Sequence, residues 1–372
     1  MPVTHRNSVA FTVIVAVAVV LCSIPLLLVI LLSGAPTTMV LAVILAALPV
    51  GPVLAAFMWL DRYEPEPRSL LVAGLLWGAL VATGAALVIN GIGGFFVGFD
   101  SPITVAVVAP FAEEATKGFF LLMLLWWRRH ELDGILDGIV YAGMVGIGFA
   151  FTENILYLAA AYDGTDGLGP GGVEGVTTVF VIRCLFSPFA HPFFTAAIGI
   201  GVGLAVTTRS PLVRWTAPVI GYFFAVLGHA LWNGSTFVAE GVGFILTYFL
   251  VMVPGFVVLT GFAIWLRSSE KRLLHDSLHD AAARGLLPAE EIPHLVDLRH
   301  RRASRRHANQ YGGAGARQAM QDYQQAAIEL GFLHHRYLRG TAPHDFASRG
   351  RAHVAQMQAA RPHISFPFQV VP

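Results

Sequence analysis

Residues 103–127 read ITVAVVAPFAEEATKGFFLLMLLWW, an apolar run that is broken by Glu113, Glu114 and Lys117. The run is long enough to cross a bilayer as a helix, because about 20 apolar residues suffice. An ionised side chain at that depth costs a few kcal/mol. We therefore expect these three residues to have partners or a task, and they mark the first candidate functional site.

The composition of the whole chain is typical of a membrane protein. Of its 372 residues, 55% are hydrophobic and only 13% are charged, whereas a soluble domain has about 25% charged residues. Apolar blocks of helical length recur along the chain, so we predict an all-α, polytopic transmembrane helix bundle with a C-terminal tail. The eight predicted spans cover residues 9–32, 39–60, 69–90, 103–127, 135–161, 178–207, 215–238 and 241–266.

Charge predicts both the orientation and the domain boundary. Lys and Arg between predicted spans occur in alternate loops, for example Arg62, Arg68 and Arg128. By the positive-inside rule these loops and both termini lie in the cytoplasm. Residues 1–266 hold 9 Lys and Arg against 14 Asp and Glu, while residues 267–372 hold 15 against 9. We predict a transmembrane domain followed by a basic, His/Arg-rich cytoplasmic tail that is partly helical or disordered.

Small residues recur at four-residue spacing in several spans. Examples are Gly74 and Gly78 in the third span and Gly199 and Gly203 in the sixth. Such rows allow helix backbones to approach closely in lipid. They predict a compact bundle and carry no chemical information. The two cysteines, which also lie in apolar segments, are expected to be free thiols.

Further polar residues lie at membrane depth in the three spans after the fourth. Glu153 and Asn154 are in the fifth span, His191 is in the sixth, and His229 and Asn233 are in the seventh. The last two are four residues apart, so they share one helix face. A single buried histidine is more often structural than catalytic. Two histidines level with a pair of glutamates favour a metal or catalytic site.

Several common site types are missing from the sequence. It has no His-Glu-x-x-His zinc motif, no Gly-x-Ser-x-Gly elbow and no Gly-x-x-x-x-Gly-Lys phosphate loop. Any metal must therefore be held by side chains from separate helices. Glutamate and histidine ligands suit zinc.

The order of these motifs resembles the PrsW family of intramembrane proteases, within the wider group that includes type II CAAX prenyl endopeptidases. The segments 61–67 and 137–141 are also similar to that family. The CAAX branch usually has Arg at the place of Lys117 and His at that of Glu153, so the likeness is to PrsW. The matching motifs are Glu113-Glu114-x-x-Lys117, Phe149-x-x-x-Glu153-Asn154, His191-Pro192-Phe193 and His229-x-x-x-Asn233.

The resemblance implies a multi-pass protease of the bacterial cell membrane that hydrolyses peptide bonds. Its implied substrates are membrane-anchored proteins such as anti-sigma factors. The expected partners are such a substrate and the lipid bilayer, with no nucleic acid. The resemblance covers residues 50–240 and leaves the tail unexplained.

We hypothesise that a water-activating site lies between the fourth and seventh spans. In this hypothesis Glu114, His191 and His229 bind zinc, and Glu113 is the general base. Asn233 donates a hydrogen bond to the oxyanion. Lys117 keeps the ligand carboxylate ionised, and Glu153 with Asn154 orients the ligands. A mechanism without metal, in which a glutamate and a histidine activate water, would use the same residues.

Two other functions use similar residues. An ion- or proton-coupled transporter also buries Glu, His and Lys, but it needs polar groups through the whole bilayer. Here the polar residues cluster at one level, and segments such as 121–125 and 217–225 are apolar. A non-catalytic membrane scaffold could retain the fold, although it has no need for complete motifs.

Overall fold

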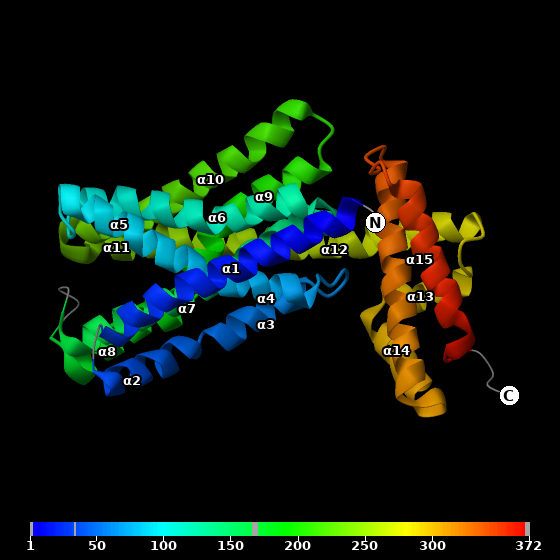
Figure 1. Cartoon of the computed structure of the whole chain (residues 1–372), viewed down its shortest axis with the longest axis horizontal. Coiled ribbons are helices and arrows are strands. Elements are labelled where there is room, and N and C mark those ends of the chain that lie inside the picture. The colour runs from blue at the N-terminus through cyan, green and yellow to red at the C-terminus, as the bar shows by residue number, and fades with distance from the viewer. Residues whose placement is uncertain (1–2, 33–34, 166–169, 369–372) are drawn as a thin grey trace. The chain divides into compact units, whose positions relative to one another are not determined.

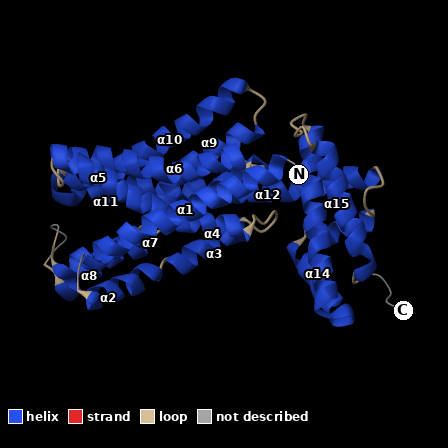
Figure 2. Cartoon of the chain, viewed as in Figure 1, coloured by secondary structure: helices blue, strands red, loops and turns tan. Residues whose placement is uncertain are grey.

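The structure, a computed structural model, describes residues 3–32, 35–165 and 170–368, so the outer ends of both predicted domains lie outside it. Within these ranges every regular element is a helix and none is a strand (Figure 2). The prediction of an all-α fold is therefore confirmed. The chain divides into two compact units: unit 1 is residues 1–60 and 66–263, and unit 2 is residues 61–65 and 264–372.

Unit 1 contains the long apolar helices (Figure 1). Several of them run together through short π-helical segments. The helices are α1 (Val3–Leu32), α2 (Pro36–Ala47), α3 (Val50–Leu60), α4 (Arg68–Leu76), α5 (Thr83–Val97), α6 (Ala109–Trp127), α7 (Ile135–Asp163), α8 (Gly172–Phe180), α9 (Ala190–Thr207), α10 (Pro211–Gly234), α11 (Val242–Thr247) and α12 (Val253–Ala283), the last of which continues into unit 2. The π-helical segments are η1 (Trp77–Ala82), η2 (Thr104–Val108), η4 (Val181–Phe186) and η7 (Tyr248–Met252).

Seven helices in the described part of the chain are long and apolar enough to cross a membrane. They are Val9–Leu32, Pro36–Leu60, Arg68–Val97, Ile135–Asp163, Gly172–Thr207, Pro211–Phe237 and Val242–Ala283. Each matches one of the eight predicted spans. The remaining prediction, residues 103–127, corresponds to η2 and α6, which are helical but carry three ionisable side chains. Those charges lower the hydropathy of this helix.

Helix α7 is the centre of unit 1, and 83% of the residues in its most apolar 18-residue stretch are buried. Glycines allow its neighbours to approach. A Cβ atom at Gly199 of α9 would lie 2.2 Å from the carbonyl oxygen of Gly138 in α7. A Cβ atom at Gly78 would lie 1.9 Å from the carbonyl oxygen of Val145. The prediction of close packing through small residues is confirmed at both positions.

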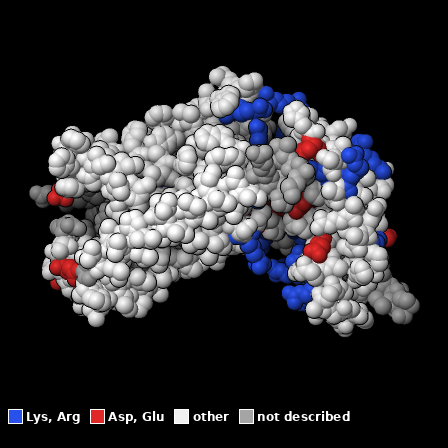
Figure 3. All heavy atoms as spheres, in the orientation of Figure 1, with Lys and Arg blue, Asp and Glu red and all other residues white. Residues whose placement is uncertain are grey.

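The outer surface of unit 1 is apolar. Large hydrophobic side chains such as Leu32, Val88 and Phe224 are exposed on it, as expected of helices that face lipid. In the view of Figure 3 the sides of these helices carry few charged atoms, whereas Lys, Arg, Asp and Glu side chains are frequent on the surface of unit 2.

Unit 2 is a helical domain with a core of its own. Besides the end of α12, it contains α13 (Ile292–Val296), α14 (Leu298–Leu338) and α15 (Phe346–Ala360). Leu278, Leu295 and Tyr323 are among the buried residues of its core. Helix α14 is broken at Gly313, which has a φ of 71°, a conformation that glycine adopts without steric cost.

Short 3₁₀ turns occur in both units of the described chain. They are η3 (Arg129–Glu131), η5 (Ser235–Phe237), η6 (Ala239–Gly241), η8 (Ala289–Glu291) and η9 (Arg361–His363).

Candidate functional site

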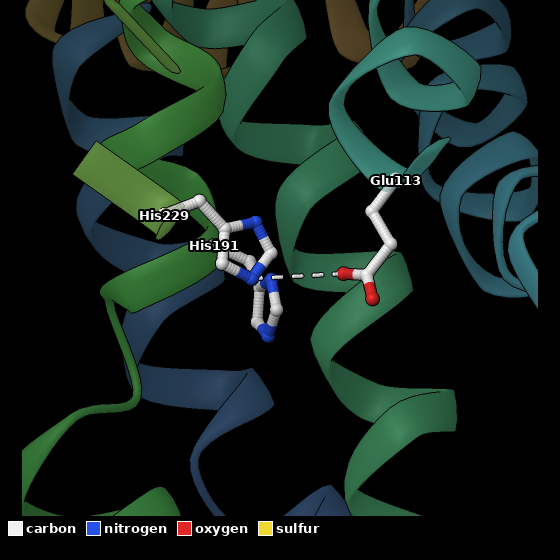
Figure 4. A group of neighbouring side chains, drawn as sticks. All are labelled: Glu113, His191 and His229. Atoms are coloured by element: carbon white, nitrogen blue, oxygen red, sulfur yellow. Dashed lines mark ion pairs between the residues drawn. The ribbon is translucent and has the colours of Figure 1, made fainter. Parts of the chain in front are cut away.

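Three side chains from three helices converge inside unit 1. Glu113 of α6, His191 of α9 and His229 of α10 each offer one ligand atom, and these atoms all lie within 4.8 Å of one another. Figure 4 shows the Glu113 carboxylate directed toward the two imidazole rings. All three residues are buried. The arrangement is one that a single metal ion could bridge.

Glu114 belongs to the same cluster, but its carboxylate is already occupied. Oε1 lies 2.8 Å from Nζ of Lys117 and 3.0 Å from Nδ1 of His229. Oε2 accepts a hydrogen bond from the hydroxyl of Thr195 at 2.9 Å. With no exposed surface and both oxygens engaged, Glu114 is held in one orientation.

Glu113 has the opposite environment. Its Oε2 atom is buried and has no hydrogen-bond partner among the residues that the structure describes. The nearest cationic or imidazole nitrogens, Nζ of Lys117 and Nε2 of His229, are each 3.7 Å away. A buried carboxylate oxygen without a hydrogen bond is costly, and a metal cation at this point would satisfy it. The donor set of one carboxylate and two imidazoles fits zinc.

Lys117 connects the glutamates of α6 with His191 of α9. Besides Glu114, its ammonium group contacts Nδ1 of His191 at 3.1 Å and lies 3.8 Å from the centre of the Phe149 ring. Its side chain is fully buried. One lysine therefore contacts side chains of both α6 and α9, and Phe149, one helical turn before Glu153, adds a cation–π contact.

The position of His191 depends on a break in the sixth predicted span. The π-helical segment η4 ends at Phe186, and α9 begins at Ala190. Pro188 lies in the break, where a missing N–H costs least. Such irregular backbone is tolerated in a membrane only where protein surrounds it. The break places His191 in the first turn of α9, with Nε2 2.7 Å from Oε2 of Glu153.

The other predicted residues lie farther from the cluster. Asn154 accepts a hydrogen bond from Nε of Arg183 at 2.8 Å. Asn233 donates its amide to the carbonyl oxygen of Val105 in η2 at 3.0 Å. Of the residues singled out from the sequence, Glu113, Glu114, Lys117, Glu153, His191 and His229 are brought together, whereas Asn233 is directed at the backbone of η2.

Two residues of this network were missed by the sequence analysis. Thr195 gives no signal, because a threonine in an apolar helix is common. Arg183 did give one, because an arginine within a predicted span is as costly as the glutamates.

The two further segments that resembled the PrsW family also meet in the structure. The hydroxyl of Tyr141 in α7 donates to Oε2 of Glu66 at 2.6 Å, and the contact is buried. Glu66 lies two residues before the start of α4 at Arg68, so this bond fixes the segment that leads into α4 against α7.

The fold and the site together define a multi-pass membrane protein with an intramembrane Glu/His centre. The sequence model of the PrsW family intramembrane metalloprotease matches residues 66–259, which are just over half of the chain. The chain belongs to this family. It is therefore a peptidase embedded in a membrane by several helices, and it acts on membrane-anchored protein.

Bacterial proteins named Protease PrsW are similar to this chain at modest sequence identity. Protease PrsW of Oceanobacillus iheyensis is 24% identical over 237 residues, which cover 63% of this chain and 100% of the relative. Protease PrsW of Bacillus subtilis is 29% identical over 184 residues, with 47% and 74% covered. Protease PrsW of Clostridioides difficile is 34% identical over 117 residues, with 30% and 49% covered. No solved structure matches the chain.

Proposed function

We propose that this protein is a zinc-dependent intramembrane protease whose metal is held by Glu113, His191 and His229. The observation that carries the proposal is the convergence of their ligand atoms within 4.8 Å, together with Oε2 of Glu113, which accepts no hydrogen bond from the described residues. When bound, zinc supplies a Lewis acid that makes water a nucleophile near neutral pH.

The contacts support a change in the roles of the two glutamates. The sequence hypothesis made Glu114 the ligand and Glu113 the base. Glu114 instead orients the site, because Thr195, Lys117 and His229 use both of its oxygens. Glu113 then provides the ligand oxygen Oε2. Its second oxygen accepts the proton of the attacking water and returns it to the leaving amine.

Lys117 and Glu153 hold His191. Glu153 accepts from Nε2 of His191, so Nδ1 of that ring faces Lys117 and the centre of the site. A ligand histidine usually donates its other nitrogen to a carboxylate in this way. The oxyanion role of Asn233 stays a prediction, and its bond to Val105 leaves one amide hydrogen for it.

The substrate is a single-span membrane protein, and an anti-sigma factor is the candidate that the family suggests. We further propose the bacterial cell membrane as the location, with both termini in the cytoplasm. Basic residues at alternate helix ends, such as Arg62, Arg128 and Arg209, support this orientation. Residues 267–372 then form a water-facing cytoplasmic domain. A reporter fused at the C-terminus tests the orientation, and reporter activity on the outer side would contradict it.

The decisive experiment is purification in detergent, followed by metal analysis and cleavage of candidate single-span proteins. The parent is expected to retain one equivalent of zinc and to cleave. Glu113→Gln and His229→Ala should lose both properties while remaining folded. Glu131→Gln, which alters an ion pair with Arg128 outside the site, is the matched control. Full activity in either site variant would refute the proposed centre.

A further inference from the structure

Arg183 contacts both polar residues of the Phe149-x-x-x-Glu153-Asn154 motif. One of its terminal nitrogens forms an ion pair with Oε2 of Glu153, and its Nε donates to Oδ1 of Asn154 at 2.8 Å. The guanidinium also lies 3.9 Å from the centre of the Tyr157 ring. All three of its partners are on α7, whereas Arg183 is in η4.

Glu153 shares one oxygen between two elements. The same Oε2 atom that pairs with Arg183 also contacts Nε2 of His191 at 2.7 Å. The three groups therefore form a relay from η4 through α7 to α9. Asn154 takes part in this relay only through Arg183, to which its side-chain oxygen is hydrogen-bonded.

Charge explains why the relay needs an arginine. Glu153 is mostly buried in an apolar bundle, and its ionised form requires a nearby cation. Arg183 offers its Nε to Asn154 and a terminal nitrogen to Glu153, in the forked geometry that a lysine lacks. An ionised Glu153 can only accept hydrogen bonds, so Nε2 of His191 must carry the hydrogen. Nδ1 of His191 then keeps the lone pair, which faces Nζ of Lys117 at 3.1 Å.

We propose that Arg183 is a positioning residue for His191, acting through Glu153. This inference rests on the proposed function only for its effect on metal and turnover. The tautomer that it assigns to His191 is a property of the protein itself. No described hydrogen bond or ion pair joins Arg183 to Glu113 or His229, so its direct contact with the site runs through Glu153.

The π-helical form of η4 supports the assignment. Residues Val181–Phe186 form this wider turn immediately before the break at Ser187–Phe189. π-helical turns are frequent at functional sites. Arg183 thus anchors η4, the segment just before His191, to α7.

The test compares Arg183→Gln and Arg183→Lys with Arg128→Gln, which breaks an ion pair of similar exposure outside the site. Arg183→Gln is expected to lower kcat and metal affinity by about 10- to 100-fold, with KM unchanged. Arg183→Lys should recover part of the loss, and Arg128→Gln should behave as the parent. Parental kcat and metal affinity in Arg183→Gln would overturn the inference.

A double-variant cycle separates positioning from general stability. If Arg183 acts through Glu153, Arg183→Gln combined with Glu153→Gln should be no worse than Glu153→Gln alone. Full additivity of the two losses would contradict the relay. If Arg183→Gln does not fold, the double variant, which removes both buried charges, still allows the comparison with Glu153→Gln.

A last measurement does not depend on metal or activity. In metal-free protein with ¹⁵N-labelled histidine, the resonances absent from His191→Gln are those of His191. They should show hydrogen on Nε2 in the parent and in Arg128→Gln, and a changed tautomer balance in Arg183→Gln. An unchanged balance would sink this inference alone. A parent protein that binds no zinc would instead contradict the proposed function.

Discussion

Glu114 lies 3.0 Å from Nδ1 of His229, and this contact determines which nitrogen of the ring faces the site. A carboxylate only accepts hydrogen bonds, so Nδ1 carries the hydrogen and Nε2 is left with its lone pair. Nε2 is the atom that lies 3.7 Å from Oε2 of Glu113. The two adjacent glutamates of α6 therefore act on opposite nitrogens of one imidazole.

This arrangement predicts different losses for the two glutamates. Glu113→Gln removes the proposed ligand and should abolish zinc retention. Glu114→Gln keeps the ligand set but weakens the orientation of His229, so zinc affinity should fall by about 10- to 100-fold. Equilibrium dialysis against a competing chelator measures both. The reverse order, with Glu114→Gln the more severe, would restore the original sequence hypothesis.

A second prediction concerns Thr195, whose hydroxyl donates to Oε2 of Glu114. Thr195→Val retains the shape of the side chain and leaves a buried carboxylate oxygen unsatisfied. The free energy of unfolding should fall by about 1–3 kcal/mol. The control is Thr207→Val on the same helix, since that hydroxyl bonds only to backbone carbonyls of α9. Chemical unfolding in detergent micelles compares the two, and equal losses would count against the role of Thr195.

The sequence predicted which polar residues lie close together better than it predicted their contacts. The cost of an ionised group in lipid identifies Glu113, Glu114 and Lys117 without any structure. Which carboxylate is saturated depends on rotamers and on a threonine from another helix, and neither is visible in a motif. Arg183 was identifiable by the same cost and was overlooked. Asn233 was predicted from its spacing to His229, which fixes a helix face but not the group opposite it.

The bundle was predictable because lipid imposes long apolar helices on the chain. The break between η4 and α9 was signalled by Pro188 and Pro192, although its consequence for His191 was not. The helices of unit 2 give a weaker signal. Its core residues, such as Leu295 and Tyr323, are sparse in a stretch rich in Arg, His and Gln, so composition alone resembles a solvated tail.

A third prediction tests the contact of α7 with α9. Gly199→Val would place side-chain atoms inside the contact distance of the Gly138 carbonyl. The two helices must separate, which should destabilise unit 1 by about 3 kcal/mol or more and abolish cleavage, because Glu153 and His191 lie on these helices. Gly261→Ala on α12 is the control, since open space surrounds that position. Thermal unfolding followed by tryptophan fluorescence should leave the control near the parent.

A fourth prediction is that unit 2 loses stability in acid. Burial lowers the pKa of His294, His335 and His353 below the ordinary value for histidine. The unfolded chain therefore binds more protons than the folded chain once the pH falls below about 6.5. The stabilisation is fully present above that pH and is lost as the pH falls toward the folded pKa values.

Hydrogen–deuterium exchange on the full-length protein at pH 7.5 and 5.5, corrected for the intrinsic rate, follows this loss in peptides of residues 264–368. Protection should fall at the lower pH. His294→Gln should reduce the fall, whereas the exposed His344→Gln serves as the matched control. Protection that rises on acidification would show the sign to be wrong.

A fifth prediction concerns Arg301, which holds the segment 61–65 within unit 2. Its guanidinium is buried, with Nε donating to the carbonyl of Leu295 and one terminal nitrogen donating to that of Tyr63 at 3.0 Å. Burial lowers the pKa of Arg301, which means that its charge is costly there and depends on these carbonyl dipoles. A lysine keeps the charge but cannot reach both acceptors with one rigid fork.

Arg301→Lys should therefore destabilise unit 2 more than Arg301→Met, because methionine removes the buried charge together with its donors. Amide exchange in peptides that cover residues 61–65 and 292–301 should accelerate in both variants, and more strongly for lysine. The exposed Arg302→Lys is the control. A larger effect for methionine would mean that the charge itself stabilises the contact, since only then does keeping a cation outweigh the loss of the fork.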